Sequence, residues 1–269
     1  MGSNDSRPSS PAELLRLARF DLTLLPDELL LLVLSFLPSR DLVLQCRLVC
    51  RRWRSLVDSP CLWRLKCGRR WRTSQLEALH GCPNVSWARV YVKEPFGRNL
   101  LRNPCGREQF QHWELRHGGH GWRVENNRSN LEGAEDQRSF VSSFNWCTKW
   151  QVIDLLKEGL WKELLDHHQP EISISDWYAG RSDCGCVYKI HVKLLAANKR
   201  SVIEEFSRTM EPIPQWNDEC YHQVSHVFRN YGPGVRFVHF LHEGKDTQFW
   251  AGHYGARITN SAVTVTLPK

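Results

Sequence analysis

Two adjacent aromatic residues, Phe249 and Trp250, lie in a stretch, 246–261, that is made mostly of small, polar and glycine residues. Large aromatic side chains are usually buried in cores, and turn-like segments rarely carry two of them. The pair either packs to close the end of a sheet or offers an apolar surface to a ligand. The chemistry that these residues could perform is therefore non-covalent binding.

Groups for bond-breaking chemistry are scarce by comparison. Asp183, Glu243 and Asp246 could pair as the two carboxylates of a glycosidase, but the sequence does not set their separation. The chain has no nucleophile elbow, P-loop or zinc hydrolase motif, and no RING-like set of cysteines and histidines. The sequence therefore predicts a protein that is not an enzyme and that carries no cofactor.

Cysteine and histidine spacing does not indicate a metal site. The ten cysteines are spread through a chain long enough to bury a core without disulfides, so we expect reduced thiols in the cytosol. The closest pair, Cys184 and Cys186, has no second pair at zinc spacing. Four histidines are likewise not placed as metal ligands: His117, His120, His167 and His168.

Positive charge is concentrated in one segment. The chain has a formal net charge of +7, and residues 40–72 alone hold ten basic side chains against two acidic ones, Asp41 and Asp58. Such a concentration indicates either an acidic partner surface or a solvated helix face. No DNA- or RNA-reading motif accompanies the arginines, so we expect no nucleic-acid partner.

The first part of the chain is typical of helices. Pro26-Asp27-Glu28 predicts the start of a helix that ends before Pro38, Ser39 or Asp41 can cap a short second helix, and residues 47–57 predict a third. The first helix is apolar on every side, which a unit of about fifty residues cannot bury. Either it packs beneath a larger domain, or, as we favour, its leucines bind another protein.

The second part is typical of an antiparallel β-sandwich. Residues alternate between apolar and polar in several segments that are separated by Gly, Pro, Asn and Asp. The predicted strands are 140–146, 172–177, 187–194, 235–240 and 262–267. One helical insert, about 158–166, interrupts them. The predicted fold class is thus α+β and multidomain, with helices followed by a connector and a sandwich.

Short motifs in the helical part carry a resemblance. They are Leu25-Pro26-Asp27-Glu28-Leu29-Leu30, then Leu37-Pro38, then CRLVCRRWR at 46–54, then Leu62-Trp63. Over roughly residues 22–67 the chain resembles an F-box. That resemblance implies a three-helix motif that docks on the Skp-type adaptor of a cullin–RING ubiquitin ligase. It also implies that eight side chains mix adaptor contacts with internal packing: Leu25, Pro26, Leu29, Leu30, Val33, Val49, Cys50 and Trp53.

The β-rich part carries a second resemblance. Its motifs are FGRNLLRNP at 96–104, GGHGW at 118–122, DWYAGR at 176–181, GPGVR at 232–236 and GHYGARITNS at 252–261. From about residue 93 to the end, the chain resembles the F-box-associated domain of the sugar-recognising F-box proteins. The resemblance implies a galactose-binding-like β-sandwich that holds the di-N-acetylchitobiose core of N-linked glycans.

The resemblance also implies which residues would bind the sugar. A sugar ring has an apolar C–H face, which an aromatic ring can cover, and an edge of hydroxyl groups, which polar side chains can bind. Trp250 and Phe249 would form the stacking surface, Phe144 a wall for an acetamido methyl group, and Asp183 a hydroxyl or amide acceptor. This chain has Phe249 where the glycan-binding members have Tyr, and Ala251 where they have Lys.

From these observations the sequence predicts a non-catalytic substrate receptor of an SCF-type E3 ubiquitin ligase. It would bind N-linked glycans of glycoproteins in the cytosol and present them for ubiquitination and degradation. The alternative is an SCF receptor that recognises protein surfaces and binds no glycan.

The predicted limits are a disordered tail at 1–20, an F-box at 21–68, a linker at 69–92 and the sandwich at 93–269. The first six residues fit the M-G-x-x-x-[ST] pattern for myristoylation of Gly2, although so short a motif also recurs by chance. No apolar run is long enough to span a bilayer. We expect a cytoplasmic protein, with weak peripheral membrane association if Gly2 carries a myristoyl chain.

Overall fold

The computed structural model describes residues 22–71, 76, 77, 79 and 81–267. The chain divides into two compact units, Met1–Trp71 and Arg72–Lys269, which are described one at a time. The predicted tail at 1–20, with Gly2, lies outside the described residues. The division after Trp71 falls within the predicted linker, 69–92, whose limits stay a prediction.

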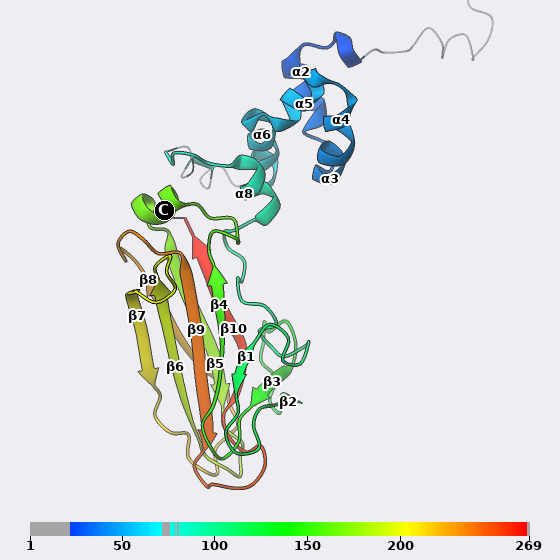
Figure 1. Cartoon of the computed structure of the whole chain (residues 1–269). Coiled ribbons are helices and arrows are strands. Elements are labelled where there is room, and N and C mark those ends of the chain that lie inside the picture. Colours follow the sequence, from blue (N-terminus) through cyan, green and yellow to red (C-terminus); the bar gives the residue numbers. More distant parts are fainter. Residues whose placement is uncertain (1–21, 72–75, 78, 80, 268–269) are drawn as a thin grey trace, which may run out of the picture. The chain divides into compact units, whose positions relative to one another are not determined.

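The first unit is helical, as the sequence predicts (Figure 1). Its elements are η1 (Leu22–Leu24), α2 (Asp27–Leu34), α3 (Ser39–Asp41), η2 (Leu42–Cys46), α4 (Arg47–Val49), α5 (Arg51–Asp58) and α6 (Pro60–Arg70). The prediction of one helix over 47–57 is wrong, because Cys50 is extended, with φ −160° and ψ 173°. Its Sγ accepts from the backbone N–H of Trp53 at 3.5 Å and so caps α5.

A small core and one basic side chain, that of Lys66, hold these helices together. Leu30 and Leu34 of α2 are fully buried, as is Leu62 of α6. Lys66 is also buried, and its Nζ donates to the carbonyl groups of Ser35 and Leu37, 3.2 and 2.6 Å away. Carbonyl groups at the end of a helix lack hydrogen-bond partners within the helix. The ammonium of Lys66 supplies such partners, and its positive charge is stabilised by the negative end of the helix dipole.

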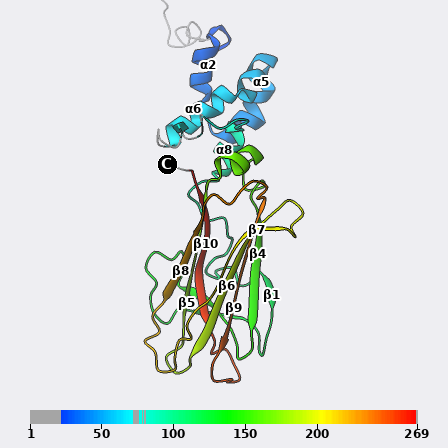
Figure 2. The same ribbon diagram turned by 90° about the vertical axis from the view of Figure 1, so that its left-hand side faces the viewer.

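In the second unit, α8 (Trp87–Lys93) is followed by two five-stranded antiparallel sheets that pack face to face (Figures 1 and 2). One sheet has the order β1 (Glu114–Arg116), β4 (Cys147–Asp154), β9 (Phe237–Asp246), β6 (Cys186–Leu195), β7 (Val202–Thr209). The other has the order β2 (Arg123–Asn126), β3 (Arg138–Val141), β10 (Arg257–Thr266), β5 (Glu171–Ala179), β8 (His222–Phe228). The predicted β-sandwich is confirmed.

Alternation in the sequence corresponds to the two faces of the strands. In β5 and β6 every second residue is buried, which places one face of each strand in the core. The predicted strand 140–146 is wrong beyond Val141, where β3 ends. The predicted helix at 158–166 is also displaced, because residues 155–159 form turns and the helical segment η3 spans Leu164–His168.

A polar cluster lies between the two sheets. The carboxylate of Asp176 on β5 accepts from Tyr188 Oη at 2.5 Å and from Ser261 Oγ at 2.8 Å, and it also contacts His242 Nδ1. All four residues are buried. The pKa of His242 is lowered to about 4, mainly by burial and to a smaller extent by the positive charge of nearby Lys149. These contacts join strands from both sheets across the core.

Candidate ligand-binding end of the sandwich

Besides residues 117–122 between β1 and β2, four connections cross from one sheet to the other at the same end of the sandwich, at the bottom of Figure 1. They are residues 142–146 after β3, 180–185 after β5, 210–221 after β7 and 247–256 after β9. Connections at the end of a sandwich are where loops converge on ligands in other folds of this architecture. All of the predicted glycan-binding residues lie on three of these connections.

Phe249 and Trp250 are presented to solvent and not enclosed. Phe249 is 68% exposed and Trp250 is 39% exposed. Phe249 has a left-handed φ of 58°, which is uncommon for a bulky residue. The buried carboxylate of Asp246, at the end of β9, holds this conformation: Oδ1 accepts from the N–H of Phe249 at 2.7 Å and Oδ2 from the N–H of Trp250 at 3.1 Å. The carboxylate of Asp246 therefore holds the backbone of the aromatic pair in place.

Phe144 lies directly against this pair. The rings of Phe144 and Phe249 meet edge to face, with centroids 5.0 Å apart. Phe144 is only partly buried, because the chain bends after β3 and places the ring at the end of the sandwich. Gly119 lies under the ring, where an added Cβ would come within 2.8 Å of Phe144 Cε1. The structure thus brings together three of the four predicted residues.

Asp183 stands apart from the three rings and is linked to them through other side chains. Its Oδ1 lies 2.5 Å from Nε of Arg181. The guanidinium of Arg181 covers the ring of Tyr254 at 4.4 Å, and Tyr254 meets Trp250 edge to face at 5.7 Å. Asp183 is therefore an ion-paired carboxylate beside the aromatic pair, and one oxygen is already engaged.

Two residues at this end have roles that the sequence reasoning missed. Asp246 was considered only as a possible glycosidase acid, yet both of its oxygens bind backbone amides of the loop. An Asp three residues before a turn residue is a known signal for such a side-chain-to-backbone contact. Tyr254 is part of the GHYG motif, and Gly252 allows its ring to pack closely, since a Cβ there would lie 2.6 Å from Tyr254 Cε2.

The three carboxylates considered for glycosidase chemistry each have another partner. Asp246 binds loop amides and Asp183 pairs with Arg181. Glu243 accepts from Thr148 Oγ1 at 3.2 Å and lies 3.6 Å from Lys189 Nζ. No acid of this set is left beside the aromatic pair to donate a proton to a leaving group.

The two buried cysteines at this end, Cys184 and Cys186, are inert. Burial raises the pKa of Cys184 to about 11 and that of Cys186 to about 12, so both thiols stay protonated and weakly reactive. Among the residues that the structure describes, no group of three or more His, Cys, Asp or Glu side chains could hold a metal ion.

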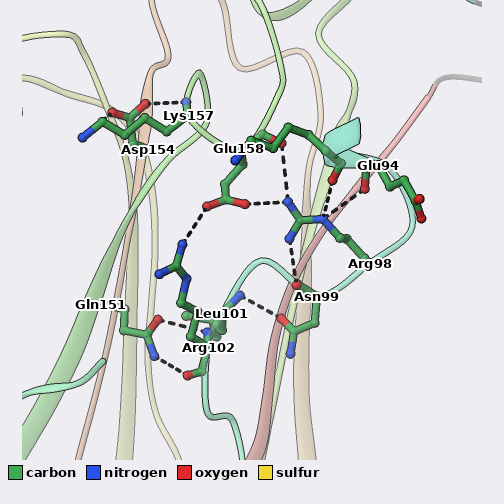
Figure 3. Close-up of polar contacts among 10 residues, drawn as sticks. Glu94, Arg98, Asn99, Leu101, Arg102, Gln151, Asp154, Lys157 and Glu158 are labelled. Carbon is green, nitrogen blue, oxygen red and sulfur yellow. Dashed lines mark hydrogen bonds and ion pairs between the residues drawn. The ribbon is translucent and has the colours of Figure 1, made fainter. Parts of the chain in front are cut away.

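A cavity of about 700 Å³ lies away from this end, between α8, β4 and the segment that follows β4. Figure 3 shows that the polar groups around it bind one another. Glu158 lies 2.5 Å from Arg98 and 3.7 Å from Arg102, and the side-chain amide of Gln151 donates to and accepts from the backbone of Arg102. These contacts hold segment 98–102 against β4, so the polar groups beside the cavity have a structural role.

The helical unit has its own exposed apolar surface. Leu29 is 48% exposed, Val33 41% and Val49 61%, and Pro26 and Cys50 are exposed as well. Leu25 and Trp53 are partly buried, whereas Leu30 is fully buried and packs inside the unit. Arg52 fixes this surface, because its guanidinium binds the carbonyl of Leu25 at 2.5 Å and the carboxylate of Asp27 at 2.7 Å.

Comparison with known proteins agrees with this division. The family model of the F-box associated region matches residues 91–265, and an F-box-like model matches residues 22–72. The chain belongs to the F-box proteins with an F-box associated region. It is 50% identical to F-box only protein 27 of Mus musculus over 255 residues, which is 91% of each chain.

Two other relatives extend the comparison. The chain is 43% identical to human F-box only protein 17 over 281 residues, covering 99% of each chain. It is 46% identical to F-box only protein 2 of Bos taurus over 250 residues, which is 90% of this chain and 82% of that one. As a member of this family the chain is a non-catalytic SCF substrate receptor whose F-box binds the Skp-type adaptor. None of the described helices is long and apolar enough to cross a membrane.

Proposed function

We propose that this SCF receptor selects glycoproteins by binding their N-linked glycans at the end of the sandwich that carries Phe249 and Trp250. The observation that carries the proposal is the exposure of two adjacent aromatic rings on a loop that a buried carboxylate holds rigid. A rigid, solvent-exposed aromatic surface binds the apolar face of a sugar without the entropic cost of ordering the loop.

The remaining predicted residues complete the site. Phe144 provides an apolar wall for an acetamido methyl group, and the free oxygen of Asp183 accepts from a hydroxyl or amide group. Covering one sugar face removes ~60–100 Å² of apolar area, worth roughly 1.5–2.5 kcal/mol. Several such contacts, less the cost of association, give affinities between about micromolar and millimolar, so substrates with several glycans are favoured.

In this proposal the substrates are glycoproteins exposed to the cytosol, including those sent there from the secretory pathway for degradation. The receptor contributes position alone: it holds the substrate where a ubiquitin-charged enzyme of the complex can reach it. A myristoyl chain on Gly2 would add weak attachment to membranes.

The test is capture of a glycoprotein by the full chain in complex with the adaptor, before and after enzymatic removal of the N-glycans. We expect capture only before removal, and we expect Trp250→Ala to reduce it by at least ten-fold. Gln248→Ala, an exposed residue of the same loop, is the matched control and should retain capture. Undiminished capture of the deglycosylated protein would favour recognition of protein surfaces.

A further inference from the structure

Trp216, on the connection between β7 and β8, is an exposed aromatic residue that is not part of the site described above. Its side chain is 78% exposed, more than that of either Phe249 or Trp250. Its backbone has a left-handed φ of 63°, a conformation that a bulky residue rarely adopts and that must be held by its surroundings.

Hydrogen bonds hold the connection against its neighbour, which carries Asp183. The N–H of Trp216 donates to the carbonyl of Ser182 at 2.7 Å, and the side chain of Gln215 donates to the carbonyl of Asp183 at 3.0 Å. Asn217 donates to the carbonyl groups of Arg181 and Pro214, 2.7 and 2.9 Å away. The backbone is thus rigid while the indole remains in solvent, which is also the arrangement of the Phe249–Trp250 pair.

The strand order places Trp216 in line with the proposed glycan site. The second to fifth strands are β4, β9, β6 and β7 in one sheet and β3, β10, β5 and β8 in the other. Each of the four connections joins the two strands that occupy the same position in their sheets. The connections therefore lie side by side in the order 142–146, 247–256, 180–185 and 210–221. Neighbouring strands are about 4.8 Å apart, so the first and the fourth connection are ~14 Å apart.

Hydrogen bonds join each connection to the next. The N–H of Asp246 donates to Ser143, the N–H of Thr247 to Gly185 and the N–H of Trp216 to Ser182, at 3.0, 3.0 and 2.7 Å. Gly185 marks how closely they pack, because a Cβ there would lie 2.5 Å from Thr247 Oγ1 and 3.0 Å from the backbone nitrogen of Gln215. Phe144, the Phe249–Trp250 pair, Asp183 and Trp216 therefore form one row.

We propose that Trp216 is a second aromatic platform of this row and that it covers a sugar unit farther along the same oligosaccharide. The inference rests on the proposed function. The connections that carry Trp250 and Trp216 are two strand spacings, ~10 Å, apart, so an oligosaccharide that is held at Trp250 reaches Trp216 with a unit beyond the one stacked on Trp250.

The surroundings of Trp216 suit a carbohydrate. Residues 211–214, 217 and 218 of the same connection, on either side of Trp216 in the sequence, line a cavity of about 520 Å³ together with Tyr178 and His222. Asp218 contributes a carboxylate to it, and a hydrogen bond from the backbone of Cys220 holds the pKa of Asp218 below its usual value. The amide of Asn217 also lines the cavity, where it is engaged in holding the loops together. An exposed aromatic ring near a carboxylate suits the apolar face and the hydroxyl edge of a sugar.

The test compares two oligosaccharides by calorimetric titration of the full chain with its adaptor. The first is N,N′-diacetylchitobiose, and the second is the core pentasaccharide of N-linked glycans. We expect Trp216→Ala to weaken binding of the pentasaccharide about ten-fold, or about 1.4 kcal/mol, and to leave chitobiose binding unchanged. Trp216→Phe should retain most of the affinity, and Trp250→Ala should weaken binding of both ligands.

Other outcomes would overturn the inference in distinguishable ways. If the wild-type chain binds neither oligosaccharide, the proposed function fails and the inference fails with it. If Trp216→Ala binds the pentasaccharide as tightly as the wild type, only the role of Trp216 fails. If that variant loses capture of an intact glycoprotein but not of the free pentasaccharide, Trp216 contacts polypeptide and not sugar.

Discussion

At the scale of single residues, Asp246 decides whether the aromatic pair is available to a ligand. Both of its oxygens accept from loop amides, and an asparagine retains only one acceptor and turns an NH₂ group toward the other amide. We expect Asp246→Asn to weaken chitobiose binding by roughly ten-fold, which is the cost of about one lost charge-assisted hydrogen bond. Titration calorimetry measures this effect, and unchanged affinity would show that the loop needs no anchor.

His242 gives the second unit a pH dependence. Burial lowers its pKa from 6.5 to about 4, so below pH 6.5 the unfolded chain binds a proton that the folded chain does not. The free energy of unfolding therefore falls as the pH falls from 6.5 toward 4, by about 2 kcal/mol at pH 5 from this residue alone. Urea unfolding at pH 7 and pH 5 measures the difference.

The imidazole resonances of His242 provide a separate check on that prediction. In the folded protein we expect them to show no protonation between pH 7 and pH 5. Titration of the ring in that interval would contradict the account of the buried cluster, even if the stability changed as expected.

Individual residues differ in how well the sequence revealed them. Phe249 and Trp250 were found because two aromatic residues among glycine and polar neighbours are unusual. Trp216 escaped notice, because a single Trp in a loop gives no signal until its exposure and its left-handed φ are known. The partners of Asp183 and Asp246 are close in the sequence, but which of these local contacts forms depends on the loop conformation, which the residue types do not specify.

At the scale of elements, α2 divides its apolar residues between the interior and the surface. Leu30 and Leu34 are buried in the unit, whereas Leu29 and Val33 are exposed. A uniformly apolar helix does not show this division in its sequence, because every face has the same character. The break at Cys50 was hidden for a similar reason: the helical periodicity continues through it.

The division in α2 predicts different results for neighbouring substitutions. Leu29→Asp combined with Val49→Asp should abolish co-purification with the adaptor while the unit stays folded, because both side chains are exposed. Leu30→Asp should unfold the unit, since it buries an unpaired carboxylate. Circular dichroism and co-purification distinguish the two effects.

The matched control for these substitutions is Val202→Asp, which changes a 44% exposed valine in the second unit. It should retain the adaptor. Full retention by the Leu29→Asp, Val49→Asp double variant would show that this apolar surface has another partner.

At the scale of the whole molecule, the two units divide the work of a receptor between adaptor binding and substrate binding. Fold and family followed from the sequence, because periodicity and local motifs specify them. The alignment of four loops into one row did not, because it arises from the strand order of two sheets. Pairing between distant strands is the part of a fold that local patterns specify least.

The most direct test of the central claim is a titration of the isotopically labelled full chain with N,N′-diacetylchitobiose, followed by amide chemical shifts. We predict that the shifts change for residues 142–146, 180–185 and 247–256 and stay constant around Glu158 and the cavity beside it. No change in these loops at millimolar sugar, or changes confined to the region around Glu158, would contradict the proposal that this end of the sandwich binds glycans.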